Sequence, residues 1–189
     1  MKGRLRKREP IKPKRQSRSG GLDVRHKPLQ DSPTPGANSA AAIVLDRLYG
    51  FTGERLYHEW AEKTLEAFAG LIPQYGLFAA TYGLAALLHA RHPLQVVVTG
   101  AAGDPKAAGL EKAAHEIYRF GKAVLRVTPE QLAEATLPAA LRETLPHLNA
   151  SVPQALVCVE TTCYPPIADR AKLTALLSEV AAGAAGSPR

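Results

Sequence analysis

The stretch QVVVTGAAGDP, residues 95–105, decides the fold of the second half of the chain. Its first five residues carry no charge, and such a run is typical of a strand that is covered on both faces in a parallel sheet. Gly100 and Gly103 favour a tight turn after it. Asp104 is a good N-cap, and Pro105 suits the first position of a helix. The stretch therefore predicts a strand, a turn and a helix, the opening unit of an α/β fold.

The same turn resembles the start of a dinucleotide-binding unit, in which glycines let backbone amides approach a pyrophosphate at a helix N-terminus. The spacing differs here, because Gly103 is followed by Asp104 and Pro105 instead of a third glycine. The carboxylate would repel a phosphate, and the proline removes an amide donor. A plain strand-to-helix turn is therefore favoured over a nucleotide site, and we expect no cofactor.

The sequence after this unit repeats the pattern of strands and helices. A second strand is expected at 123–127 and a third at 155–159, each followed by helical sequence. The apolar stripe of the last helix consists of Leu173, Leu176, Leu177 and Val180. The order β-α-β-(α)-β-α predicts a small parallel sheet with right-handed crossovers. We assign residues 93–181 to this small α/β lobe and residues 182–189 to a flexible tail.

Residues 22–92 are expected to form a segment of helical hairpins. Residues 22–37 are rich in proline and polar residues and are typical of an extended connector. Asn38 or Ser39 can cap a first helix that runs to about Tyr49. This first helix is mostly apolar.

Two more helices are predicted at 54–72 and 74–90, with Gly53 as the breaker that precedes them. Polar residues recur with helical spacing along the second helix, so one of its faces is predicted to be wet. The opposite, dry face consists of Leu56, Tyr57, Trp60, Leu65, Phe68 and Ile72. The third helix carries no charge before His89, and we expect it to be buried almost all round. Such helices are typical of an excerpt from a larger helical array.

The positive charge of the chain is concentrated in its first residues. The net charge is +7, yet residues 1–20 contain nine Lys or Arg and one Glu, so the rest of the chain is close to neutral. We expect residues 1–21 to be a disordered basic tail, because they offer almost nothing to bury. Such a tail can bind nucleic acid or acidic partners weakly and nonspecifically. It has no secretory h-region, and no apolar run in the chain is long enough to span a bilayer.

The two cysteines, Cys158 and Cys163, do not form a C-x-x-C pair, and no second pair completes a zinc site. Cys158 falls on a predicted strand, where a thiol behaves as a small apolar group. Cys163 falls in the loop that follows. We therefore interpret both as structural or incidental thiols without a disulfide framework, which fits the reducing cytoplasm.

The histidines suggest no metal site and no catalytic site. None of the six forms an H-x-x-x-H pair; they are His26, His58, His89, His92, His115 and His147. His58 falls on the predicted wet face of its helix, and His89 falls at a helix end, where a cation suits the helix dipole. We therefore predict no metal ligands among them.

Three stretches together resemble one family. They are TPGANSAA at 34–41, TGERLY at 52–57 and LVCVETTC at 156–163. In this order they are similar to the carboxy-terminal end of the spermatogenesis-associated, thioredoxin-domain-containing proteins. The resemblance implies a thioredoxin-like domain followed by a six-hairpin α/α toroid, of the kind seen in sugar epimerases and glycosidases of carbohydrate metabolism. This chain departs from that pattern: it has no thioredoxin-like domain and supplies only part of a toroid.

The resemblance leaves three hypotheses for function. The first is a carboxy-terminal fragment of such a protein without autonomous catalysis. The second is an interaction module that holds nucleic acid or acidic partners through the basic tail. The third is a sugar-active enzyme completed by oligomerisation, with a substrate-binding mouth formed by Asn38, Ser39, Gln74 and Tyr75. Residues 40–48 and 77–88 are too apolar for helices with one face in water, so we expect self-association through these helices.

Overall fold

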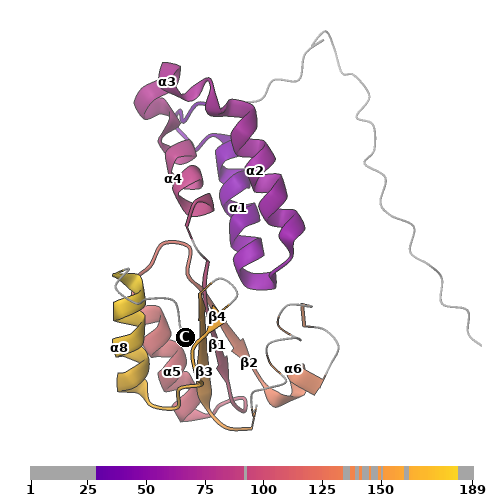
Figure 1. Ribbon diagram of the computed structural model, residues 1–189, viewed down its shortest axis with the longest axis vertical. Helices are drawn as coiled ribbons and strands as arrows, with labels where there is room; N and C mark the ends of the chain where they lie inside the picture. The colour runs from indigo at the N-terminus through magenta and orange to yellow at the C-terminus, as the bar shows by residue number, and fades with distance from the viewer. Residues whose placement is uncertain are drawn as a thin grey trace, which may run out of the picture.

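The computed structural model spans residues 1–189 and describes residues 29–91, 93–133, 137–138, 141, 145, 149, 151–159 and 162–182. A bundle of helices stands at one end and a small α/β lobe at the other (Figure 1). The mixed helical and α/β fold class is therefore confirmed. The predicted disorder and binding of the basic tail lie outside the described residues, as do residues 183–189 of the predicted flexible end.

The bundle contains α1 (Ala37–Thr52), α2 (Arg55–Ala69), α3 (Ile72–Tyr75), the 3-10 turn η1 (Gly76–Ala79) and α4 (Ala80–His89). The predicted breaker Gly53 ends α1 in the left-handed conformation, with φ of 69°. The single third helix predicted at 74–90 is wrong, because Gly76, with φ of 51°, separates α3 from the following turn and α4.

Small side chains form the centre of the bundle. Ala42 of α1, Ala61 of α2 and Ala85 of α4 are each fully buried. Alanine at these positions lets the three helix backbones approach closely, and the Tyr82 hydroxyl donates a hydrogen bond to the Leu65 carbonyl at 2.8 Å. Burial raises the pKa of Tyr82. The core is thin, which leaves much apolar surface of the helices outside it.

Asp31 ties the connector before α1 to the start of α4. Its carboxylate accepts hydrogen bonds from the backbone N–H of Thr81 at 2.8 Å and of Gly36 at 2.7 Å. These two bonds, that from Thr81 first, lower the pKa of Asp31. A side chain at Gly36 would lie 2.3 Å from the Leu29 carbonyl oxygen, so this connector requires glycine there.

We predict that Asp31→Asn lowers the free energy of unfolding by about 1 kcal/mol at neutral pH, because an amide offers one acceptor oxygen where the carboxylate offers two. A folded-state pKa below the unfolded value stabilises the fold above the unfolded pKa, and this contribution is lost as pH falls through the folded pKa. The difference between the two proteins should therefore shrink below about pH 4. Urea unfolding of both proteins from pH 7 to pH 3 measures it; a difference that does not change with pH would contradict the assignment.

The lobe contains a four-stranded sheet in the order β2-β1-β3-β4. Its strands are β1 (Leu94–Thr99), β2 (Ala123–Val127), β3 (Gln154–Val159) and β4 (Thr162–Cys163). Its helices are α5 (Pro105–Glu116), α6 (Pro129–Ala133) and α8 (Arg170–Ala181). The predicted boundary between residues 92 and 93 falls in the link between α4 and β1.

The sheet is mixed, so the prediction of an all-parallel sheet is wrong for β3. β1 and β2 are parallel, and β1 and β3 are antiparallel. Val127 at the end of β2 and Gln154 at the start of β3 both pair with Thr99. The connection between β2 and β3 therefore returns to the same end of the sheet instead of crossing it, and β3 runs backwards as a result.

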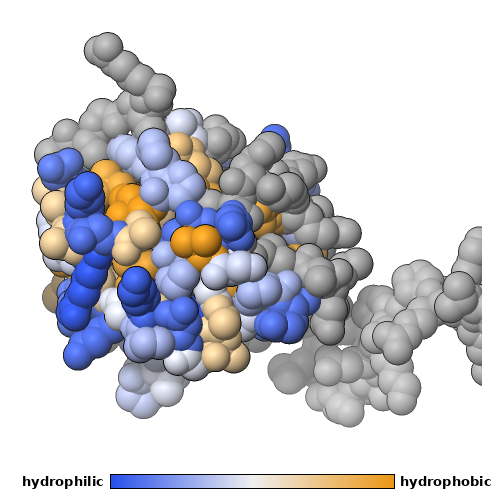
Figure 2. All heavy atoms as spheres, turned by 90° about the horizontal axis from the view of Figure 1, so that it is seen from below, coloured by the Kyte–Doolittle hydropathy of each residue, from blue (hydrophilic) through white to orange (hydrophobic). Residues whose placement is uncertain are grey.

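The sheet is covered on both faces. On one face Val96, Val98 and Val157 pack against α5 and α8, which lie side by side in Figure 1. On the other face Val97, Leu156 and Cys158 pack against Leu141 and Leu145. Viewed from the lobe end, apolar groups form small patches between polar groups (Figure 2).

The helix caps of the lobe follow the local sequence. The Asp104 carboxylate accepts hydrogen bonds from the backbone N–H of Lys106 and Ala107 at 2.8 and 3.1 Å, and Pro105 begins α5. Thr128 and Gln131 form a reciprocal capping box at the start of α6. The predicted strand-to-helix turn after β1 is thus confirmed.

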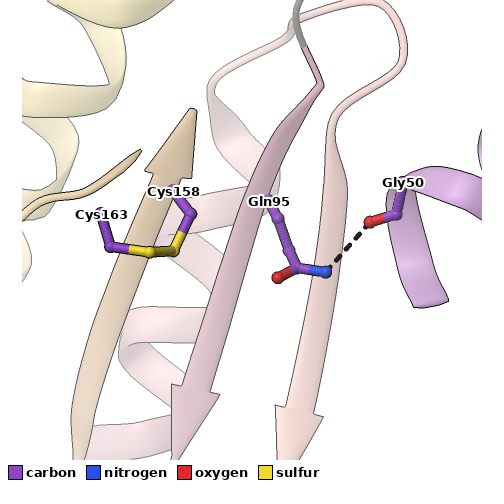
Figure 3. Close-up of a disulfide and its surroundings, with 4 residues drawn as sticks. All are labelled: Gly50, Gln95, Cys158 and Cys163. Atoms are coloured by element: carbon purple, nitrogen blue, oxygen red, sulfur yellow. Dashed lines mark hydrogen bonds between the residues drawn. A yellow bond between two sulfur atoms is a disulfide. The ribbon is translucent and has the colours of Figure 1, made fainter. Parts of the chain in front are cut away.

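Cys158 and Cys163 form a disulfide with an S–S distance of 2.02 Å (Figure 3). The interpretation of both as free thiols is therefore wrong. The chain reverses between Val159 and Thr162, which pair with each other, and this reversal places Cys163 directly opposite Cys158. The C-x4-C spacing alone does not reveal such a hairpin.

Gln95 joins the bundle to the lobe. From β1 its side-chain amide donates a hydrogen bond to the carbonyl of Gly50 at 3.0 Å (Figure 3). The same amide donates a second hydrogen bond to the carbonyl of Phe51 at 3.4 Å. The last turn of α1 is thereby held against the sheet. Among the described residues no single helix is long and apolar enough to cross a membrane; one bent pair, α2 with residues 72–89, passes on length and composition alone.

Candidate functional site

Asp46, His58 and His89 meet at one point of the bundle. Asp46 lies in α1, His58 near the start of α2, and His89 ends α4. Nδ1 of His58 lies 2.8 Å from Oδ1 of Asp46, and Nδ1 of His89 lies 3.2 Å from both carboxylate oxygens. One atom from each side chain can be chosen so that all three lie within 4.8 Å of one another.

The carboxylate of this cluster is largely removed from water. The side chain of Asp46 is 5% exposed, against 19% for His89 and 38% for His58. A buried carboxylate needs hydrogen-bond donors or a cation near it, because desolvation strongly disfavours an isolated charge. The two imidazoles supply these contacts to Asp46.

The rings of Tyr49, His58 and His89 form a stack. The His58 ring lies between the other two, with centroid separations of 4.8 Å to Tyr49 and 4.1 Å to His89. Tyr49 follows Asp46 by three positions, so both side chains project from the same side of α1. In this structure the His58 ring is therefore stacked between its two neighbours while its Nδ1 contacts Asp46.

The cluster opens into a pocket of about 290 Å³ at the junction of the bundle and the lobe. Its walls include Arg91 in the link and Gly121 from the loop before β2. Gly121 has φ of 83°, and the Leu88 side chain would lie 2.3 Å from a Cβ there. The absence of a side chain at Gly121 therefore allows Leu88 to pack against this loop.

Arg91 lines the pocket, and two further basic residues, Arg119 and Lys122, flank its lining residues Phe120 and Gly121 in the sequence. Burial lowers the pKa of Arg119, and the charge of Arg91 lowers it further. Burial also lowers the pKa of Lys122, whose ammonium donates hydrogen bonds to the carbonyls of Ala114 and Ile117. The pocket therefore combines a carboxylate and two imidazoles on one wall with Arg91 on another.

This arrangement can bind a cation or move protons. Two imidazoles and a carboxylate are ligands for borderline divalent metals, and imidazoles are also the commonest acid–base groups near neutral pH. Among the described residues that line the pocket there is no Ser, Thr or Cys to act as a nucleophile.

This cluster was not predicted from the sequence. His58 was expected on the wet face of its helix and His89 at a helix end, and the first helix was expected to be mostly apolar. The three residues are 12 and 43 positions apart, counted from Asp46, so only helix packing brings them together. The available signal was the single carboxylate of a mostly apolar helix, in which only Asp46 and Arg47 are charged. His26, His92 and His147 lie outside the described residues, and His115 is exposed at the end of α5.

The predicted substrate-binding residues lie at two separate places. Asn38 lines a shallow pocket of about 280 Å³ with Trp60 and Thr64 of α2. Ser39, the next residue in the sequence, is buried. Gln74 and Tyr75 lie in α3, where Gln74 is exposed. Neither described pocket joins the two pairs, and their role in substrate binding stays a prediction.

Two exposed apolar stripes run along the bundle. The α4 stripe consists of Leu77, Phe78, Ala80, Gly83, Leu84 and Leu87. The α1 stripe consists of Ala37, Ala41, Val44 and Leu48. Leu77 is 90% exposed and Phe78 57% exposed, so the expectation of a third helix buried almost all round is wrong for this chain. Leu56 and Trp60, which were predicted on the dry face of α2, are also exposed.

Fold and site together define a mixed helical and α/β chain with an Asp–His–His pocket at the junction of its two parts. The chain is similar to spermatogenesis-associated protein 20 from Homo sapiens, with 30% identity over 167 residues that cover 83% of this chain. It spans about a fifth of the length of that relative, since the match covers 20% of it. This similarity supports a distant relationship between the chain and spermatogenesis-associated protein 20.

No family model matches the chain, and no solved structure matches it. The resemblance noted at residues 34–41, 52–57 and 156–163 is therefore supported at the level of one distant relative. The toroid and the sugar chemistry that the resemblance implies stay predictions.

Proposed function

We propose that the chain is a binding module related to part of spermatogenesis-associated protein 20, without autonomous catalysis, and that its bundle docks against a second copy of the same chain. The α4 stripe is the observation that carries this proposal. Its exposed positions from Ala80 onward recur at i, i+3, i+4 and i+7, the spacing of one helix face. In a bundle that ends in water, such a face would normally be polar.

A second copy is the occupant that the composition favours. The α4 stripe carries no charge, so it has no electrostatic attraction for a charged partner. For the same reason, two copies of the stripe do not repel each other. Residues 1–28 are too rich in Lys and Arg to cover an apolar face. Ala80 and Gly83 are small, which allows two α4 helices to approach closely around a twofold axis.

The double variant Leu84→Lys with Leu87→Lys should weaken self-association by at least about tenfold. Each leucine contributes about 1–2 kcal/mol when its apolar surface is buried, and about 1.4 kcal/mol corresponds to tenfold. The added charges also repel each other across the twofold axis. Sedimentation velocity over a range of concentrations measures the dissociation constant.

Tyr118→Lys is the matched control, because Tyr118 is 82% exposed but lies in the lobe, beyond α5. This control should associate like the original chain. A chain that stays monomeric at every concentration tested would overturn the proposal, as would a double variant that associates as well as the control. Turnover of a sugar by the monomer would contradict the absence of autonomous catalysis.

A further inference from the structure

We infer that Asp46, His58 and His89 form a binding site for one borderline divalent cation of the zinc type. The site is independent of the proposed docking face, and nothing in the similarity to the relative points to it. The inference starts from the separation of the ligand atoms. In a tetrahedral zinc site with bonds of about 2.0–2.1 Å, neighbouring ligand atoms lie about 3.3 Å apart. The two histidine nitrogens lie 2.8 and 3.2 Å from the Asp46 carboxylate, and one ligand atom from each of the three side chains lies within 4.8 Å of the other two.

The donor types select the class of ion. Two imidazole nitrogens and one carboxylate oxygen suit zinc and neighbouring transition metals. Magnesium and calcium prefer sites built wholly from oxygen. The charge balance agrees: Asp46 contributes one negative charge in a place with little access to water, and a divalent cation would compensate it.

Three protein ligands leave a fourth position open. The cluster faces the pocket of about 290 Å³, which has room for water or a small ligand at that position. Arg91 lines the same pocket. A positive side chain next to a cation favours an anion in the open position, so the ligand class that fits is a small carboxylate or phosphate.

The histidine rings must change orientation for the ion to bind. They lie nearly parallel, with an interplanar angle of 20° and centroids 4.1 Å apart. A metal binds in the plane of an imidazole, so one ion cannot lie in the planes of two stacked rings. His58 is the more exposed of the two histidines and is the one that we expect to turn away from Tyr49.

Zinc binding to the full chain tests the inference. Isothermal titration should give one Zn²⁺ per chain and no comparable binding of Mg²⁺. The titration is done without reductant, so that the Cys158–Cys163 disulfide stays closed and supplies no thiolate. A hundredfold excess of Zn²⁺ over its dissociation constant should also raise Tm by roughly 5–10 °C.

Variants locate the ion. His58→Ala and His89→Ala should each weaken Zn²⁺ binding by at least about a hundredfold, since even indirect supports of a ligand contribute tenfold to a hundredfold. His115→Ala is the matched control, because it removes an exposed histidine from the lobe, and it should bind like the original chain. His58 is more exposed than His89, so we expect His58→Ala to fold even if His89→Ala does not. Zn²⁺ binding by His58→Ala then still tests the inference.

Nitrogen chemical shifts of the imidazoles give a second measurement. Adding Zn²⁺ should move the ring signals of His58 and His89 and leave that of His115 unchanged. The inference is overturned if Zn²⁺ does not bind, if it binds equally to His58→Ala and the original chain, or if Mg²⁺ binds as tightly.

Discussion

Replacing Leu177 by alanine should lower the free energy of unfolding by about 3 kcal/mol. Leu177 is fully buried on α8, within the cluster that α8 forms with α5 and the sheet. Removing three carbons from such a position loses the transfer free energy of the side chain and leaves a cavity that a two-helix layer can close only in part. Urea unfolding followed by circular dichroism measures the loss, with the m-value expected to stay constant.

Leu176→Ala is the control for this prediction. Leu176 is the adjacent leucine of the same helix and is only partly buried, so its replacement should cost about 1 kcal/mol or less. Helix propensity changes equally in both variants, so the difference between them isolates the packing of α8. Equal losses in the two variants would mean that α8 does not cover the sheet as described.

Asp46→Ala should lower the free energy of unfolding by about 2 kcal/mol when it is measured in the presence of a chelator. The carboxylate contacts both His58 and His89, and its removal leaves two imidazole N–H groups without their acceptor in a partly buried place. The variant thus loses the polar contacts that join α1 to α2 and to α4 at this point. Thermal and urea unfolding should therefore both shift.

Glu62→Ala is the matched control for Asp46→Ala. It also removes a carboxylate from the bundle, but from an exposed position of α2, and it should change the stability by no more than about 0.5 kcal/mol. Asp46→Asn should fall between the two, because the amide keeps the shape and one acceptor oxygen. If Asp46→Ala is as stable as Glu62→Ala, the cluster contributes nothing to the fold.

Features that depend on a few neighbouring residues could be predicted from the sequence. The run of uncharged residues at 95–99 forms β1, Asp104 caps α5, and Gly53 ends α1. In each case the interaction that decides the structure lies within about four positions along the chain. The apolar character of residues 77–88 was visible in the same way, although which positions face water was not.

The tertiary structure alone decided the features that join distant segments. The direction of β3 depends on where the connection after β2 returns to the sheet, and the pairing of Cys158 with Cys163 depends on a chain reversal between them. The cluster of Asp46, His58 and His89 exists because α1 packs against both α2 and α4 and buries a carboxylate where they meet. Local sequence fixes backbone propensities and helix ends, whereas a site made from three helices depends on the packing that orients them.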